Sequence, residues 1–383
     1  MSPTRKKLEA ATRRQPNQHV PEDIIVEILS RLPVKSLCRF KCVSKAWRNL
    51  ISDPQFVKLH LNQSIKSKRL TYVIGRLIDF PRRLELDYDS LVSGHEAKPV
   101  AEHSSFGLKF SGNGLKMKFW GSCNGLLCVF APPRTLALVN PSTRETKTIL
   151  SDHDPNIRFD FAFMHPIFGG FGYDSFNDDY KVVNIDSVAN HIPSVVYIYS
   201  LKNRAWSRIG DFPYDGRTPT SIRGYSVHMN GVVYWITRFG SEPALSITAL
   251  DLTRQEFSRI PTPLANNVWG ELYAMGGNLC IGTRDYPQEV YEFWVMEIYG
   301  VLESWRRIGL TLDCGNVPSV LDFPRSEEAL IITEGSLFIY NHRNGSLKEV
   351  NIGEIPTGYT KALLNFGFSY MESIVALQTA GQG

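Results

Sequence analysis

Beyond about residue 66 the chain repeats a pattern of tight turn and short strand, which restricts the possible folds more than any other feature. Two-residue turns precede apolar runs of strand length at intervals of roughly 40 to 60 residues. Several of these hairpins are followed by a strand, a polar turn and a strand, with Trp206, Phe257 or Trp305 at one equivalent place. No long amphipathic helix interrupts the pattern, so the region is predicted to be all-β. The six turns are Asn124-Gly125, Asp178-Asp179, Asn230-Gly231, Gly277-Asn278, Glu334-Gly335 and Glu372-Ser373.

Four antiparallel strands per repeat at this period predict a β-propeller of about six blades, with the aromatic residues packing between neighbouring blades. The last hairpin, near Glu372, has no chain left to finish its blade. Strands at 70–75 and 83–88 are therefore expected to complete it, so that both ends of the domain close the ring. The order of turns resembles kelch repeats, but their paired glycines are mostly missing, and Gly169-Gly170 precedes a first strand rather than ending a second one.

Residues 20–61 have a different pattern, that of three or four short amphipathic helices. Pro21 and Pro33 bound the first helix, and Ser44 is expected to cap a third one, which Asp53-Pro54 ends. The first helix carries two adjacent apolar rows, so one neighbour cannot cover its apolar stripe. A core of about 40 residues is too small to be stable by itself, and a partner protein is expected to cover the remainder. The two rows are Ile24 with Ile28, and Ile25 with Leu29 and Leu32.

Several phrases in this helical segment resemble an F-box. They are Leu32-Pro33-Val34-Lys35-Ser36-Leu37, Arg39-Phe40-Lys41, Val43-Ser44-Lys45-Ala46-Trp47 and the closing His60-Leu61. The segment departs from the family at Val20, where the family usually has Leu. The resemblance implies docking onto a Skp-type adaptor and, through it, a cullin, a RING protein and a ubiquitin-conjugating enzyme. The alternative is an internal helical subdomain that packs on the rest of the chain.

The F-box hypothesis divides the helical residues between an adaptor surface and the module's own core. The adaptor surface is expected to comprise Pro21, Ile24, Ile28, Leu32, Pro33, Val34, Leu37 and Trp47, with Lys45 and Arg48 as a charged rim. The core is expected to comprise Ile25, Leu29, Phe40, Val43 and Leu50.

The β region resembles the F-box-associated domain of plant F-box proteins over nearly all of residues 100–377. The phrases that carry the resemblance are SCNGLLCV, VNPSTRE, FGYDSFNDDYKVV, VYIYSLKNRAWSRI and GVVYWI. It implies a substrate receptor of a Skp-cullin-F-box ubiquitin ligase, with a tail at 1–19, the F-box at 20–62, a linker at 63–99 and a short tail at 378–383. Catalysis would then come from the conjugating partner, and this chain would be no enzyme.

The target-binding face is expected to be the one opposite the hairpin turns, because the loops there are longer. Arginine and aromatic residues are favoured in binding hot spots, and acidic or phosphorylated targets would suit the arginines. The candidates are Arg158, His165, His191, Arg217, Arg223, Arg238, Trp269, Arg284 and Tyr286.

Charge and cysteine content argue against other classes of function. The net charge of +4 resides in residues 1–19, which hold five basic residues against one acidic residue, so the remainder gives no case for nucleic acid. The basic tail is expected to be disordered, and a role in nuclear import is one interpretation of it. No apolar run approaches bilayer length, so an intracellular chain in nucleus or cytoplasm is expected. The six cysteines are not spaced as zinc ligands are, so they are expected to be buried, reduced thiols. They are Cys38, Cys42, Cys123, Cys128, Cys280 and Cys314.

No phosphate loop, nucleophile elbow or metalloprotease motif was found, and no cofactor or metal is expected. Two other functions stay open. One is an F-box protein that acts as a scaffold or inhibitor without degradation, and the other is a propeller enzyme or sugar-binding module.

Overall fold

A computed structural model of the chain describes the helical segment and most of the repeated strands. The described residues are 20–67, 70–75, 118–131, 135–149, 168–186, 194–213, 226–237, 245–264, 269–285, 290–310, 319–325, 327–333, 336–341, 343–350 and 366–377. Within them, no helix is both long and apolar enough to cross a membrane.

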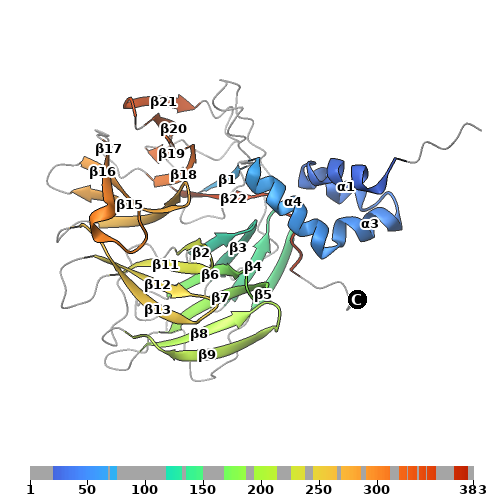
Figure 1. Ribbon diagram of the computed structural model, residues 1–383, viewed down its shortest axis with the longest axis horizontal. Helices are drawn as coiled ribbons and strands as arrows, with labels where there is room; N and C mark the ends of the chain where they lie inside the picture. Colours follow the sequence, from blue (N-terminus) through green and yellow to red (C-terminus); the bar gives the residue numbers. More distant parts are fainter. Residues whose placement is uncertain are drawn as a thin grey trace, which may run out of the picture.

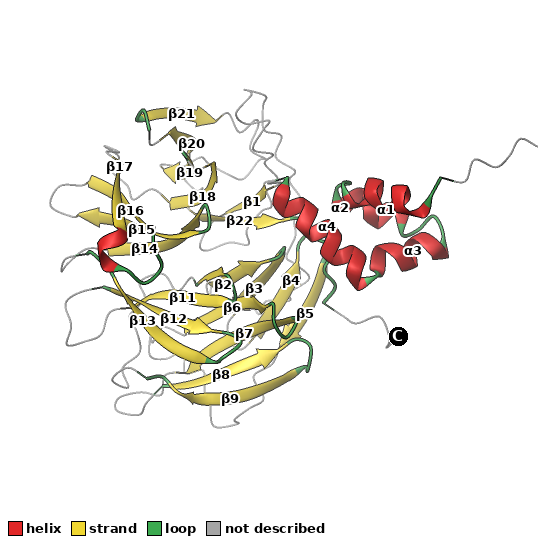
Figure 2. Cartoon of the chain, viewed as in Figure 1, coloured by secondary structure: helices red, strands yellow, loops and turns green. Residues whose placement is uncertain are grey.

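Residues 20–67 form a module of four helices, here called the helical module, which lies beside the β domain (Figure 2). The predicted helix boundaries are confirmed: the Ser44 hydroxyl accepts the Trp47 amide at 3.1 Å, and Asp53 separates the third helix from the fourth. The fourth helix continues to Lys66, four residues past residue 62, where the F-box was expected to end. The helices are α1 (Glu22–Ser30), α2 (Val34–Phe40), α3 (Lys45–Ser52) and α4 (Pro54–Lys66).

The β domain is a propeller in which each blade is a four-stranded antiparallel sheet with its strands in sequence order. The first blade has β2 (Lys118–Cys123), β3 (Leu126–Ala131), β4 (Thr135–Asn140) and β5 (Glu145–Ile149). The second has β6 (Phe168–Asp174), β7 (Asp179–Asp186), β8 (Val195–Ser200) and β9 (Ala205–Asp211). The third has β10 (Val227–Met229), β11 (Val232–Thr237), β12 (Ser246–Asp251) and β13 (Glu256–Pro261). The fourth has β14 (Trp269–Met275), β15 (Asn278–Asp285), β16 (Val290–Met296) and, after the 3₁₀ turn η1 (Leu302–Ser304), β17 (Trp305–Leu310). The fifth has β18 (Ser319–Arg325), β19 (Glu328–Thr333), β20 (Ser336–Asn341) and β21 (Ser346–Val350).

The estimate of six blades is wrong, because the described residues form five four-stranded sheets and one two-stranded sheet. The inner strands of consecutive blades contact one another around the ring shown in Figure 1. Between the fifth and first blades lies the two-stranded sheet, in which β1 (Leu70–Gly75) pairs with β22 (Phe366–Met371) and β22 contacts both β18 and β2. Closure of the ring by segment 70–75 and a C-terminal strand is therefore confirmed, but that strand precedes Glu372 and the two form no complete blade. The second proposed closing strand, 83–88, falls outside the described residues.

Four of the six predicted hairpin turns join the first and second strands of a blade, as expected, and two do not. In the fifth blade Glu334-Gly335 falls between β19 and β20, which are the second and third strands. After β22, Glu372-Ser373 starts no hairpin, and residues 372–377 form no strand. The short apolar run after each turn looked alike in sequence, but only pairing between strands decides its place in a blade.

The turns between third and fourth strands are stabilised by the last side chain of the third strand. The side-chain oxygens of Asn140, Asp251 and Asn341 each accept the backbone amide two residues on, at 2.9, 2.8 and 3.0 Å. Asn and Asp favour such local hydrogen bonds, which explains why they end these strands. In antiparallel blades the turns between first and second strands and those between third and fourth strands lie at the same face of the ring. This face is called here the hairpin face.

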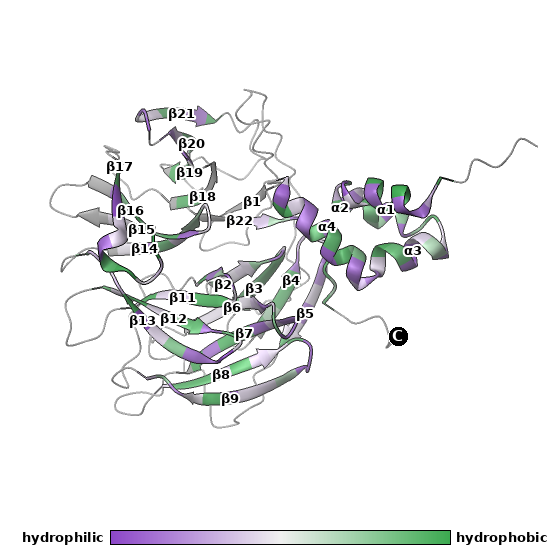
Figure 3. Ribbon diagram, viewed as in Figure 1, coloured by the Kyte–Doolittle hydropathy of each residue, from purple (hydrophilic) through white to green (hydrophobic). Residues whose placement is uncertain are grey.

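The hydrophobic core lies between blades rather than at one centre, and four clusters join successive blade pairs. Trp206, Phe257 and Trp305 pack between the first and second, second and third, and third and fourth blades respectively, which confirms the predicted role of these aromatics. Gly169 lies within β6, where a Cβ atom would overlap the Trp120 ring of the first blade. In Figure 3 the middle strands β3 and β4 are mainly hydrophobic, and the outer strand β5 carries more hydrophilic residues.

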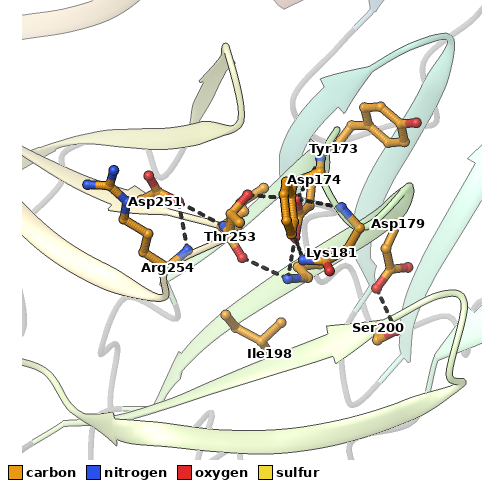
Figure 4. Close-up of polar contacts among 12 residues, drawn as sticks. Tyr173, Asp174, Asp179, Lys181, Ile198, Ser200, Asp251, Thr253 and Arg254 are labelled. Carbon is orange, nitrogen blue, oxygen red and sulfur yellow. Dashed lines mark hydrogen bonds and ion pairs between the residues drawn. The ribbon is translucent and has the colours of Figure 1, made fainter.

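A buried ion pair of the second blade is hydrogen-bonded to the third blade (Figure 4). The Lys181 ammonium donates to Asp174 Oδ2 at 2.7 Å and to the Leu252 carbonyl oxygen, also at 2.7 Å. Asp174 also accepts the Thr253 hydroxyl, and its carboxylate is fully buried. Burial alone would raise the pKa of Asp174, but hydrogen bonds from Asn177, Lys181 and Thr253 outweigh it and hold the pKa well below its ordinary value.

Replacing Lys181 with Met should destabilise the domain by about 3–5 kcal/mol, because the Asp174 carboxylate would stay buried without its partner. The double variant Asp174→Asn, Lys181→Met should recover part of the loss, since no buried charge remains. Arg208→Met removes an exposed ion pair with Asp211 in the same blade and should cost at most about 1 kcal/mol. Urea unfolding midpoints of the three variants and the wild type measure these losses of stability. Equal losses for the buried and exposed pairs would contradict the argument.

Candidate protein-interaction site

The helical module exposes one apolar row of α1 and buries the other. Ile24 and Ile28 are 50% and 55% exposed, one helical turn apart, whereas Leu29 is buried against the other helices. This confirms that the two rows face different surroundings. Two large aliphatic side chains held side by side in water mark a surface that a partner can cover.

The structure divides the predicted adaptor residues by exposure. Leu32 and Trp47 are half-buried, and Trp47 packs edge-on against Phe40 with ring centroids 5.2 Å apart. Val34 and Leu37 are fully buried among α3 and α4, so neither side chain is open to a partner in this structure and their placement on the adaptor surface is corrected. The exposed members of the predicted set are Pro21, Ile24, Ile28, Pro33, Lys45 and Arg48.

Val43 was expected in the core of the module and is instead 65% exposed. It lies in the turn between α2 and α3, where the chain leaves the helical row that the periodicity describes. The seven-residue helix α2 has one apolar face, and Val34 and Leu37 of that face are buried in one cluster with Ile51 of α3 and Phe56 of α4. Ile25, Phe40 and Leu50 are half-buried and pack around this core, and Leu29 is inside it.

The last member of the helical core comes from the other end of the chain. Ile374 is buried in one cluster with Leu29, Leu37, Ile51 and Phe56. It belongs to residues 372–377, here called the C-terminal segment, which follows β22. The helices therefore do not close their core alone, and the chain itself supplies part of the cover that the sequence had assigned to a partner.

The C-terminal segment is held to the first blade by specific contacts. The Asn140 side-chain amide donates to the carbonyl oxygens of Ser373 (3.0 Å) and Val375 (2.8 Å), and the Leu377 amide donates to the Glu145 carboxylate (2.9 Å). Val375 and Leu377 are buried in the core between the first and second blades. One short segment thus packs into both the helical module and the ring.

Helix α4 makes a second connection to the ring. The Lys58 ammonium pairs with the Asp178 carboxylate at 2.7 Å in the turn between β6 and β7, and Val57 packs on both the helical core and the ring core. The interpretation as an internal subdomain is therefore correct to this extent, since the module packs on the ring while still exposing α1. Both contacts hold the exposed row at a set orientation to the ring.

The expected target-binding residues are mostly outside the described part of the chain. Only Trp269 and Arg284 lie within it, directly opposite each other in the pairing of β14 with β15, at the end of the sheet away from the hairpin face. Both residues were expected in loops, and the structure places them at strand ends instead. Their part in binding stays a prediction. Outside the described residues are Arg158, His165, His191, Arg217, Arg223, Arg238 and Tyr286.

A cysteine and a histidine meet on the inner strands of the first and third blades. Cys123 Sγ lies 3.3 Å from His228 Nδ1, and His228 Nε2 lies 3.2 Å from the Tyr173 carbonyl oxygen. Burial raises the pKa of the Cys123 thiol and lowers the pKa of His228 to about 4. Both groups are thus neutral near pH 7, and the pair lacks the thiolate that a cysteine nucleophile requires.

The remaining thiols mostly agree with the sequence analysis. Cys128 and Cys280 are buried and Cys38 is half-buried, but Cys42 is exposed, and Cys314 is outside the described residues. No three His, Cys, Asp or Glu residues in the described part of the chain come together as metal ligands.

His228 should make the fold less stable in acid. An unfolded histidine has a pKa near about 6.5. As the pH falls from there towards 4, the unfolded state binds a proton that the folded state does not, so the free energy of unfolding decreases by up to about 1.4 kcal/mol per pH unit. His228→Gln should flatten this part of the profile in urea unfolding at pH 7, 6, 5 and 4.5. An unchanged slope would show that His228 is not the responsible group.

Comparison with known proteins finds a matching family for each of the two parts of the chain. A family model described as F-box domain matches residues 18–59, and one described as F-box associated beta propeller domain matches residues 92–377. The F-box protein CPR1 of Arabidopsis thaliana is 27% identical over 374 residues, covering 90% of this chain and 87% of that protein. The F-box/kelch-repeat protein At3g23880 of the same plant is 28% identical over 354 residues, covering 88% and 92%.

Proposed function

Because the chain belongs to the F-box proteins that carry an F-box associated beta propeller domain, we propose that it is a substrate-recognition subunit of a Skp-cullin-F-box ubiquitin ligase. The observation that carries this proposal is the exposed row of Ile24 and Ile28 on α1. The rest of the F-box core is closed by the chain's own C-terminal segment, so this row is apolar surface left for an adaptor.

The proposed mechanism needs no catalytic residue in this chain. The F-box would bind the Skp-type adaptor and, through it, the cullin, the RING protein and the ubiquitin-conjugating enzyme. The propeller would hold the target, which raises the effective concentration of a target lysine near the conjugating enzyme. The contacts of Ile374, Val57 and Lys58 support this role, because a propeller held firmly to the F-box keeps the target at a constant place. We place this activity inside the cell, in the nucleus, the cytoplasm or both.

The proposal is tested by affinity purification of the full chain and of a chain lacking residues 20–62, with the proteasome blocked. Proteins recovered with both forms are candidate targets, and proteins lost with the deletion are the ligase. Recovery of no adaptor or cullin with the full chain would refute the ligase role. A target that does not accumulate when the proteasome is blocked would instead favour the scaffold function.

A propeller enzyme finds no support in the described site chemistry. The cysteine and histidine that lie closest to a catalytic arrangement, Cys123 and His228, are buried and neutral. A sugar-binding module stays an alternative that glycan affinity without the F-box would favour.

A further inference from the structure

The outer hairpin of the fourth blade differs from its counterparts. Its turn has eight residues, 297–304, where the other blades have four, for example 252–255 in the third blade. The Ser304 hydroxyl donates to the Val301 carbonyl oxygen at 2.7 Å and accepts the Ile298 amide at 3.0 Å. Hydrogen bonds within the turn therefore help to order it.

This ordered turn presents large apolar side chains to solvent: Ile298, Tyr299, Val301 and Leu302 are all exposed. Turns on the surface are usually built of small and polar residues, and a cluster of large apolar ones is typical of an interaction site. Since the backbone is already ordered, a partner would lose little conformational freedom of the turn on binding.

A cavity of about 460 Å³ opens beside the turn, between the third and fourth blades at the hairpin face. Its volume falls in the range of ligand pockets, about 300–1,000 Å³. Tyr234, Leu279 and Met296 form the apolar part of its lining with Phe257, and polar residues such as Asn230 and Asn278 form the rest. Tyr299 of the turn lies edge-on to Tyr234 with ring centroids 6.3 Å apart, so the turn and the cavity form one continuous surface, called here the blade 4 surface.

The charges around the blade 4 surface are mainly negative. Asp251, Glu256 and Glu303 are carboxylates and Arg254 is a single guanidinium, and none of the four has an ion-pair partner among the described residues. Glu297 of the same turn is already paired with Arg306. A partner that brings a lysine or arginine next to an apolar side chain would therefore match both the charge and the apolar part of the lining.

We propose that the blade 4 surface binds an extended segment of the target protein, with a large apolar side chain in the cavity and a lysine or arginine beside it. This proposal rests on the substrate-receptor function above and differs from the expected face, since the surface lies with the hairpin turns. The fourth blade lies across the ring from the helical module (Figure 1). A target can thus occupy it while the F-box is bound to the adaptor.

The test selects peptides from a phage-displayed library of random dodecapeptides on the full chain. The enriched peptides are expected to carry a large apolar residue next to Lys or Arg. Tyr299→Ser and Glu256→Arg should each weaken their binding by about tenfold or more, measured by fluorescence anisotropy, as expected for a hot-spot residue. Phe176→Ser, which removes an exposed aromatic residue from the same face, should leave binding unchanged. Replacing the basic residue of the peptide with Glu should also abolish binding.

Several results would overturn the proposal: no enriched peptide, an acidic consensus, or binding that neither Tyr299→Ser nor Glu256→Arg weakens. A dimer of the wild-type chain that dissociates in Tyr299→Ser, seen by light scattering, would assign the surface to a second copy of the chain and also overturn it. Adaptor binding is measured on the same proteins. If the wild-type chain bound no adaptor, the ligase function would be refuted. The peptide results decide separately whether the blade 4 surface binds a target segment.

Discussion

Replacing both Ile24 and Ile28 with Asp is expected to abolish binding of a Skp-type adaptor without unfolding the chain. Both side chains are at least half exposed, so charging them costs the free protein little. In the complex the same positions would be buried, where an unpaired carboxylate is strongly unfavourable. Loss of two central apolar contacts should weaken binding at least about 100-fold, measured by isothermal titration with purified adaptor.

Leu347→Asp is the matched control for this pair of substitutions. Leu347 is also a large exposed aliphatic residue, but it lies on β21 in the fifth blade. It should leave adaptor affinity unchanged. If the double variant bound the adaptor as tightly as the wild type, α1 would not be the docking surface and the ligase assignment would lose its main support.

Ile374→Asp should also abolish adaptor binding, by a different route. Ile374 is buried in the core of the F-box although it lies more than 300 residues away in sequence. Loss of a buried isoleucine costs about 2–5 kcal/mol, and an unpaired buried carboxylate adds to that cost. The helices should therefore unfold or detach locally while the ring, with its separate cores between blades, stays folded.

Hydrogen exchange follows this effect directly, with faster exchange expected in α1, α2 and α3 and unchanged exchange in the third and fourth blades. Ala376→Asp is the matched control, because Ala376 is exposed in the same segment. Asn140→Ala should produce a weaker form of the same result, since it removes two hydrogen bonds to the segment. Normal protection of the helices in Ile374→Asp would show that the F-box folds without the C-terminal segment.

Much of the local structure could be predicted from the sequence. Ser44 and Asp53 cap helices where expected, and four of the predicted turns open blades. The equivalent aromatics Trp206, Phe257 and Trp305 were found from the repeat and pack between blades. These features depend on neighbours a few residues apart, which periodicity and turn chemistry describe well.

The candidate site was predicted less completely. The exposed row of α1 was correct, but Val34 and Leu37 were assigned outward and Val43 inward. The blade 4 surface was missed, although one signal was present: the turn at 297–304 is twice as long as its counterparts and rich in large apolar residues. Binding was expected instead at the longer loops of the opposite face, and most of the candidate residues there lie outside the described residues.

The sequence by itself determined the two-part organisation, the helical and strand periods, and the excess of apolar surface on α1. Only the tertiary structure decided the number of blades, the partner strand of β1, and the place of Ile374 inside the F-box. The physical reason is that a local pattern shows which side chains share a face, whereas the cover of that face comes from segments distant in sequence. The core of the N-terminal helices is thus completed by Ile374 of the chain's own C-terminal segment, and the row of Ile24 and Ile28 on α1 stays exposed.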